Sequence, residues 1–222
     1  VFPFEVDFYQ KNQQNALFVG HPLAQSLSPR KNHVAGKNIT LMPGSREGEV
    51  KRLLPEMLSA AQLMAEQDQE LSFHLVLAND TLREWAEQQI QNLGVSISVG
   101  DAHQRIEQSD LVLVASGTAT LEVALIGVPM VVIYKLSAMS YFIASRLVKS
   151  PYVSLPNVIA NQALVPELIQ KDANGENIAQ HAIYILNRDN QSLVKEFNAI
   201  HAQLKHDNDD QAVKAIMDLV NE

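Results

Sequence analysis

Short apolar runs alternate along the chain with longer segments in which apolar residues recur every three or four positions. The short runs are rich in β-branched residues and nearly continuous in apolar character, which predicts β-strands covered on both faces. The expected strands are Ala16–Val19, Asn38–Met42, Ser72–Leu77, Val95–Val99, Asp110–Ala115, Met130–Tyr134 and Tyr152–Leu155.

The segments between these runs predict amphipathic helices. Apolar residues from Val50 to Met64 follow the spacing of one helix face, and Thr81–Asn92 carries a second apolar stripe. Repeated strand–helix–strand units imply parallel crossovers, so the expected fold class is α/β with a doubly wound parallel, Rossmann-like sheet. After Pro166 the pattern becomes that of a helical C-terminal tail. The helices expected there are Leu168–Gln170, Asn177–Leu186, Ser192–Leu204 and Gln211–Val220.

The composition is that of a folded globular protein. Of the 222 residues, 46% are hydrophobic and 19% are charged, which excludes the disordered and fibrous classes. The chain has 17 Lys and Arg residues and 25 Asp and Glu residues, which gives a formal net charge of −8. Broad nucleic-acid binding requires clustered positive charge, so no nucleic-acid partner is expected.

The residue types also narrow the chemistry. The chain has no cysteine, which excludes a disulfide scaffold and any thiolate nucleophile or metal ligand. Its seven histidines are scattered without ligand spacing, so no metal is expected. His21 alone stands at a predicted strand end, where a structural role is the simpler interpretation. No apolar run reaches the roughly 18 residues of a membrane span, and the start at Val1 predicts a piece of a longer protein.

The sharpest local motif is Leu41-Met-Pro-Gly-Ser-Arg-Glu-Gly-Glu49, between a predicted strand and a predicted helix. It places Gly44, Ser45 and Arg46 at a helix N-terminus, where free N–H groups and the helix dipole favour anions. Arg46 adds a permanent charge suited to phosphate. The alternative is a plain helix start with Ser45 as the N-cap residue. The motif is neither a Walker A loop nor a dinucleotide fingerprint.

A second motif of this kind runs from Leu111 through Ser116, Gly117 and Thr118 into another predicted helix. Glu122, one turn further, is placed to accept hydrogen bonds from a ribose diol. The alternative for Glu122 is an acid that complements the helix dipole. Because ligands of open α/β sheets bind beyond the carboxyl ends of the strands, two such turns on parallel strands strengthen the binding interpretation.

Two further segments leave alternatives open. Asn157 follows a proline at the end of an apolar run, so its amide can face the same crevice or simply cap a turn. Tyr134–Lys149 mixes aromatic, aliphatic and basic residues. Such a helix can lie in an anionic membrane interface or pack in the core with its basic ends reaching solvent.

The motifs together resemble one family, bacterial lipid-A-disaccharide synthase, over nearly the whole chain. The resemblance implies an inverting glycosyltransferase of the two-domain GT-B type, peripheral on the cytoplasmic face of the inner membrane of a Gram-negative bacterium. It implies transfer from UDP-diacylglucosamine to diacylglucosamine 1-phosphate with release of UDP, and no metal or other cofactor. The segments that carry it, in order, are Pro3-Phe-Glu5, Phe8-Tyr9, Val19-Gly-His-Pro22, Leu41–Arg46, Ala115–Glu122, Tyr134-Lys135, Arg146–Lys149, Tyr152–Asn157 and Val165–Gln170.

The resemblance also implies residue roles, with the donor held by the C-terminal half. Arg46 and Asn157 would stabilise the donor phosphates and the leaving UDP, Glu122 would bind the ribose, and the turn Gly100–Ile106 would meet the uracil. The catalytic base would lie outside this chain. The full set of implied donor-binding residues is Gly44, Ser45, Arg46, Ser116, Gly117, Thr118, Glu122 and Asn157.

The implied organisation has three parts. Residues 1–20 lead from a missing N-terminal half that carries the acceptor site, residues 21–189 form the UDP-sugar-binding domain, and helices in 190–222 pack on the missing half or a partner. A homo-oligomer is expected, and the chain alone is expected to bind donor without transferring sugar. The stretch from His21 to Met42 is shorter than the family implies, which leaves open whether residues are missing within 26–38. The alternatives are half of another UDP-sugar transferase or epimerase, or a non-catalytic nucleotide-binding or membrane-docking module.

Overall fold

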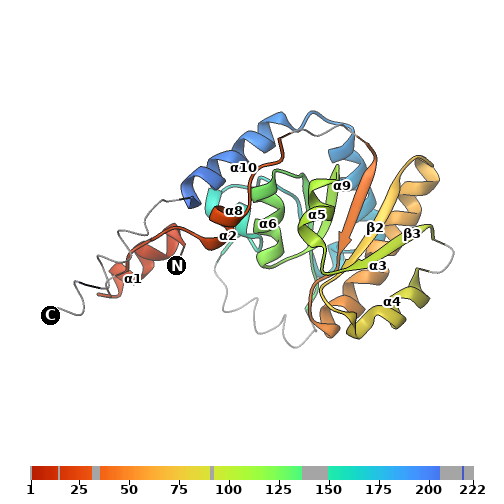
Figure 1. Cartoon of the computed structure of the whole chain (residues 1–222), viewed down its shortest axis with the longest axis horizontal. Coiled ribbons are helices and arrows are strands. Elements are labelled where there is room, and N and C mark those ends of the chain that lie inside the picture. The colour runs from red at the N-terminus through yellow and green to blue at the C-terminus, as the bar shows by residue number, and fades with distance from the viewer. Residues whose placement is uncertain are drawn as a thin grey trace.

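The computed structural model describes residues 2–14, 16–31, 36–90, 93–136, 150–205 and 217. Within them, six parallel strands form one sheet in the order β3-β2-β1-β4-β5-β6. Figure 1 shows helices on both faces of this sheet, so the doubly wound parallel fold is confirmed. The strands are β1 (Asn38–Met42), β2 (Ser72–Leu77), β3 (Val95–Val99), β4 (Leu111–Ala115), β5 (Met130–Tyr134) and β6 (Glu167–Ile169).

One face of the sheet packs against α3 (Glu47–Gln67), α4 (Arg83–Gln89) and α9 (Gly175–Leu186). Alternate strand residues such as Leu41 and Leu75 point into this layer, because side chains of a strand alternate between faces. The predicted stripe from Val50 to Met64 is the buried side of α3, and its Met57 and Leu54 are fully buried. A 3-10 turn, η1 (Asp80–Leu82), leads into α4.

The other face is covered by α5 (Ala102–Glu107), α6 (Thr118–Ile126), α8 (Leu155–Ala160) and α10 (Gln191–Leu204), with α2 (Pro22–Ser26) at the margin. Phe197 of α10 is fully buried in this layer beside α6 and α8. Figure 1 shows α10 lying along the domain, while α1 (Pro3–Lys11) lies apart from the sheet. Thus α10 belongs to this domain; whether residues 206–222 pack on another part stays a prediction.

Most predicted strands agree with the structure because each has a paired neighbour. Three other predictions are wrong. Ala16–Val19 forms no strand and leaves Leu17 49% exposed, since no strand pairs with it. Tyr152–Leu155 forms no strand, because residues 152–154 are irregular and Leu155 begins α8. Leu168–Gln170 is not helical: Leu168 pairs with Ile133 in β6, and the 3-10 turn η2 (Gln170–Asp172) follows.

The remaining helix predictions agree within a few residues. Thr81–Asn92 corresponds to η1 and α4, Asn177–Leu186 to α9, and Ser192–Leu204 to α10. The predicted helix Gln211–Val220 and most of Tyr134–Lys149 lie outside the described residues.

Candidate functional site

The two sequence motifs meet at one place in the sheet. They follow β1 and β4, which pair in parallel with Met42 opposite Val114. The strand order reverses between these two strands, since β2 and β3 lie on one side and β5 and β6 on the other. Ligands of such sheets bind beyond the strand ends at this reversal. The two turns are also close, because a Cβ built on Gly44 would lie 3.5 Å from the Cβ of Ala115.

The N-terminus of α3 is open. Arg46 is the N-cap residue and no side chain caps the first turn, so the alternative interpretation, with Ser45 as the N-cap residue, is wrong by one residue. Within the described part of the chain, the N–H groups of Glu47 and Gly48 have no hydrogen-bond partner. Unpaired N–H groups at the positive end of a 21-residue helix can receive an anion.

Arg46 adds a positively charged side chain at this helix end. Its side chain is 83% exposed, and its guanidinium lies 3.3 Å from the Glu49 carboxylate. Glu49 also lies against the turn, because a Cβ on Gly44 would come within 2.8 Å of its Oε2. The guanidinium is therefore available to a ligand, but an incoming phosphate competes with the Glu49 carboxylate.

A second open helix end begins α6. Its N-cap residue Gly117 has φ 147°, a conformation that favours glycine. The N–H groups of Gly117, Thr118 and Ala119 have no partner among the residues described, whereas Thr120 N–H donates to the Gly117 carbonyl at 3.1 Å. A Cβ on Gly117 would meet no heavy atom within 4 Å. This turn can therefore also receive an anion, beside the first.

Ser116 is less available than the sequence predicts. Its hydroxyl donates to the Val153 carbonyl at 2.8 Å, and its backbone N–H donates to the Ile133 carbonyl at 3.0 Å. Both of its donors are used inside the fold, so the geometry does not support a Ser116 side chain that donates to a pyrophosphate. For Gly117 and Thr118 the cradle role stays a prediction.

Glu122 lies on α6 with its side chain 21% exposed, and its carboxylate is 3.4 Å from the Nε2 of His103. His103 belongs to the first turn of α5, in the segment Gly100–Ile106 that is expected to meet uracil. The structure thus brings the predicted ribose residue and the predicted base-binding turn together. The sequence does not reveal His103 beside Glu122, because nothing in the spacing links positions 19 residues apart on two different helices.

Asn157 faces the interior. It is 1% exposed, and its amide donates to the carbonyl of Val165 and to the carboxylate of Glu167, each at 2.9 Å. Its carbonyl accepts from the N–H groups of Leu164 and Val165 at 2.9 and 3.0 Å. All the hydrogen-bonding positions of the side chain are used, so none is left for a phosphate. The expected phosphate contact of Asn157 is corrected to a role inside the fold.

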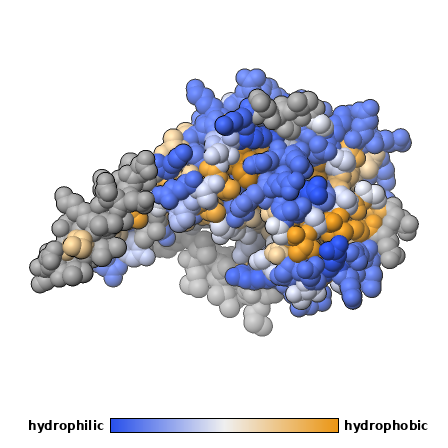
Figure 2. Space-filling view, in the orientation of Figure 1, coloured by the Kyte–Doolittle hydropathy of each residue, from blue (hydrophilic) through white to orange (hydrophobic). Residues whose placement is uncertain are grey.

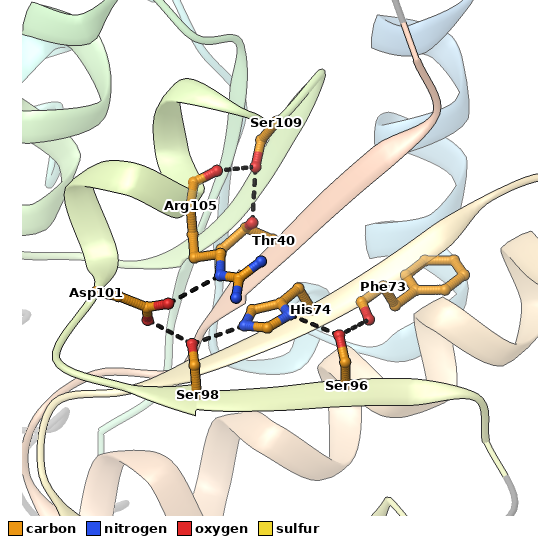
Figure 3. Close-up of polar contacts among 8 residues, drawn as sticks. All are labelled: Thr40, Phe73, His74, Ser96, Ser98, Asp101, Arg105 and Ser109. Atoms are coloured by element: carbon orange, nitrogen blue, oxygen red, sulfur yellow. Dashed lines mark hydrogen bonds and ion pairs between the residues drawn. The ribbon is translucent and has the colours of Figure 1, made fainter.

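A polar cluster occupies the face of β1, β2 and β3 on the α5 side, and Figure 3 shows its contacts. Nδ1 and Nε2 of His74 lie 2.5 and 2.6 Å from the hydroxyls of Ser96 and Ser98. The Ser98 hydroxyl donates to the Asp101 carboxylate, which also accepts from Nε of Arg105 at 2.9 Å. His74, Ser96 and Arg105 of this cluster line a hollow of about 460 Å³.

The contact with Ser98 assigns one proton of the His74 ring. Since the Ser98 hydroxyl is committed to Asp101, its oxygen can only accept, which places the ring proton on Nε2. The Ser96 hydroxyl donates to the Phe73 carbonyl at 3.2 Å, and a neutral ring requires it to turn and donate to Nδ1 instead. Burial and then the charge of Arg105 lower the pKa of His74, while Asp101 acts in the opposite direction. The lowered pKa favours the neutral ring at pH 7.

We expect the wild-type protein to lose more stability than a His74→Asn variant when the pH falls from 7 to 5. The folded-state pKa of His74 lies below its value of about 6.5 in an unfolded chain. The unfolded state therefore binds more protons in this window, and the free energy of unfolding falls as the pH drops below about 6.5. Urea unfolding at both pH values measures this. The pKa of His21 is also lowered by burial, but His21 is present in both proteins and cancels. Equal losses would contradict the prediction.

His21, which follows the wrongly predicted strand Ala16–Val19, has a structural role. His21 accepts from Leu23 N–H at 3.2 Å as the N-cap residue of α2, and its ring stacks on Phe2 at 5.0 Å. In the part of the chain that the structure describes, no group of three metal-ligating side chains occurs. No helix there has both the length and the apolar character needed to cross a membrane.

A larger hollow of about 1030 Å³ lies away from these motifs. Arg30, Lys37 and Arg188 line it together with Asp68 and Asp110. It lies at the amino ends of the strands, opposite to the two motifs, and none of the predicted donor-binding residues lines it. We therefore take the carboxyl ends of β1 and β4, where Arg46 and the two open helix N-termini lie, as the candidate site, although this hollow is larger.

A model of the lipid-A-disaccharide synthetase family matches residues 1–216. The chain belongs to this family. It is 41% identical to the lipid-A-disaccharide synthase of Pseudomonas putida KT2440 over 100% of this chain, and 38% identical to that of Colwellia psychrerythraea 34H. The chain spans 62% and 60% of the length of these two relatives.

Solved structures share the fold of this lipid-A-disaccharide synthetase family member. The C-terminal CMP-Kdo binding domain of WaaA from Acinetobacter baumannii has a TM-score of 0.52 at 15% identity, covering 77% of this chain and 90% of that domain. UDP-GlcNAc 2-epimerase from Neisseria meningitidis bound to UDP-GlcNAc has a TM-score of 0.56 at 13% identity, covering 84% and 45%. TarM has a TM-score of 0.56 at 14% identity, covering 100% and 43%. The expected Rossmann-like domain of GT-B type is confirmed.

Proposed function

We propose that this chain forms the nucleotide-sugar-binding part of a lipid-A-disaccharide synthase. The donor would be UDP-diacylglucosamine, and the reaction an inverting transfer to diacylglucosamine 1-phosphate that releases UDP. The observation that carries the proposal is the pair of open helix N-termini at the reversal of strand order, beside the exposed Arg46, in a chain of this family.

The arrangement suits the chemistry of the leaving group. As the bond between the sugar and UDP breaks, negative charge builds on the phosphate oxygen that departs. The N–H groups of α3 and α6 are fixed donors near that position, and such donors lower the barrier because they need little reorganisation. The exposed guanidinium of Arg46 adds positive charge there once it leaves Glu49. Gly44 and Ser45 bring the turn close to β4, and Glu122 is placed to accept from the ribose diol.

The finer parts of the proposal concern regions that this chain does not contain or the structure does not describe. We place the acceptor site and the catalytic base in the part of the protein beyond the length this chain covers. Membrane contact at the cytoplasmic face of the inner membrane would use Tyr134–Lys149. A second copy of the chain would cover exposed apolar residues such as Leu17 and Val19, and Figure 2 shows apolar patches on a mostly hydrophilic face.

Calorimetric titration tests the donor site directly. We expect UDP to bind the 222-residue chain at one site, and CDP at the same concentration to bind more weakly. Disaccharide formation is not expected from this chain alone. Titrating UDP-diacylglucosamine against other UDP-sugars separates the proposed donor from those of other transferases and epimerases. Absence of any heat with UDP would refute the donor site.

A further inference from the structure

Glu167 organises the chain segment that borders the α6 turn. It is the first residue of β6, and its carboxylate accepts from the N–H groups of Val153 and Ser154, each at 2.9 Å. It also accepts from the Ser154 hydroxyl at 2.6 Å and from the amide of Asn157 at 2.9 Å. All four donors belong to the short segment between residues 153 and 157. Among the residues that the structure describes, these four donors are the groups that offset its charge.

The segment that Glu167 holds is bonded in turn to the candidate phosphate site. The Val153 carbonyl accepts from the Ser116 hydroxyl at 2.8 Å, directly before the α6 turn. The next contact is Leu155 N–H, which donates to the Thr120 hydroxyl at 3.2 Å, and that hydroxyl donates to the Gly117 carbonyl at 2.8 Å. Two hydrogen-bonded routes therefore join Glu167 to the residues on either side of the open N–H groups.

We propose that Glu167 is a positioning residue for phosphate recognition, which sets the orientation of the α6 turn through residues 153–155. The inference rests on the proposed function, because it concerns how that same site binds the pyrophosphate of the donor. Glu167 does not touch the ligand itself. It holds residues 153–155, which are hydrogen-bonded to Ser116 and Thr120 on either side of the turn. The N–H groups of Gly117 and Thr118 thereby keep one orientation.

The carboxylate is chemically suited to this role, and an amide is not. Oε1 accepts three of the four hydrogen bonds and Oε2 accepts the one from Val153 N–H. In a Glu167→Gln variant the oxygen can keep the three contacts, but the amide nitrogen then faces the Val153 N–H, and two donors oppose each other. The substitution therefore disturbs Val153, whose carbonyl holds Ser116, and retains the rest of the network.

The test compares UDP with uridine by ligand-observed NMR titration of the whole chain. Glu167→Gln should weaken UDP binding about tenfold, the size of one lost hydrogen bond to a charged group, and change uridine binding less than about twofold. A role in stability alone would lower both affinities in the same ratio or neither. Equal effects on UDP and uridine would therefore overturn the proposal, as would unchanged UDP binding.

Asp110→Asn is the matched control. The Asp110 carboxylate likewise accepts from backbone N–H groups, those of Gly36, Lys37 and Asn38 at 2.8 to 3.0 Å. These contacts lie at the amino ends of the strands, opposite to the candidate site. The Asp110→Asn substitution should leave the ratio of UDP to uridine affinity unchanged; the same loss as in Glu167→Gln would count against positioning.

A second variant approaches the network from the other side. Thr120→Val keeps the volume of the buried Thr120 and removes its contacts with Leu155 and Gly117, so it should reproduce the selective loss of UDP even if Glu167→Gln folds poorly. If Thr120→Val folds and binds UDP like the wild type, the proposal fails. Failure of the wild-type chain to bind UDP would instead refute the proposed function, and the two results are distinguishable.

Discussion

Replacing Arg46 with alanine should weaken UDP binding about 10- to 100-fold and leave the free energy of unfolding nearly unchanged. A hydrogen bond to a charged group contributes about 1.5–3 kcal/mol, which corresponds to that range of affinity. The side chain is 83% exposed and its described contact is the ion pair with Glu49. Because surface ion pairs contribute at most about 1 kcal/mol, its loss should cost the fold little. Calorimetry with UDP and urea unfolding measure the two quantities.

Arg83→Ala is the control for that variant. Arg83 is also an exposed arginine in ion pairs, with Asp80 and Glu87, but it lies after β2, away from the reversal of strand order. UDP affinity should be unchanged in Arg83→Ala. An Arg46→Lys variant should retain only part of the affinity, because an ammonium cannot make the bidentate contact of a guanidinium. Undiminished binding by Arg46→Ala would remove this residue from the site.

A Gly175→Ala variant should lower the free energy of unfolding by about 1–3 kcal/mol or more, the range of core overpacking. Gly175 begins α9, where the helix lies directly on α3. An added Cβ would come within 2.3 Å of the Ser59 hydroxyl oxygen and 2.7 Å of its Cβ, and within 3.3 Å of the Ala60 nitrogen. The two helices must therefore separate, and urea unfolding monitored by circular dichroism reports the cost.

The complementary substitution identifies the cause. Ser59→Gly removes both of the closest atoms, so the double variant should recover part of the stability that Gly175→Ala loses, although glycine within a helix costs about 1 kcal/mol itself. Gly48→Ala is the control, because its new Cβ would meet only the flexible end of Arg52, at 3.2 Å. If Gly175→Ala is as stable as Gly48→Ala, the close packing of α3 and α9 does not limit stability.

The sequence predicts the parts of the fold that depend on local pattern. Runs such as Leu111–Ala115 are buried on both faces, and the stripe of α3 has helical spacing, so the order of residues alone indicates both elements. Residues at Ala16–Val19 look the same in sequence, but a strand also requires a partner, and pairing is a tertiary property. Leu168 shows the converse, since three residues become a strand only because β5 lies beside them.

In the candidate site, too, the sequence predicts what local pattern determines and misses what tertiary packing determines. The anion-receptive turns follow from strand–turn–helix order, because the carboxyl ends of parallel strands meet at one edge. Asn157 cannot be assigned in this way, since its amide can face either the crevice or the core, and the structure places it in the core. The contribution of Glu167 is also hidden in the sequence, because its four donors are 10 to 14 residues away along the chain.

The reversal of strand order between β1 and β4 has a consequence for how the protein folds. The two anion-receptive turns are separated in sequence by α3, β2, η1, α4, β3, α5 and β4, yet they are neighbours only when β4 pairs with β1. A partly folded chain that contains β1 to β3 has one of the turns and not the other. A ligand that needs both can therefore bind only after this long-range pairing is complete, and it would then stabilise the native state by mass action. Binding of UDP would in this way report that the sheet has assembled in its native order.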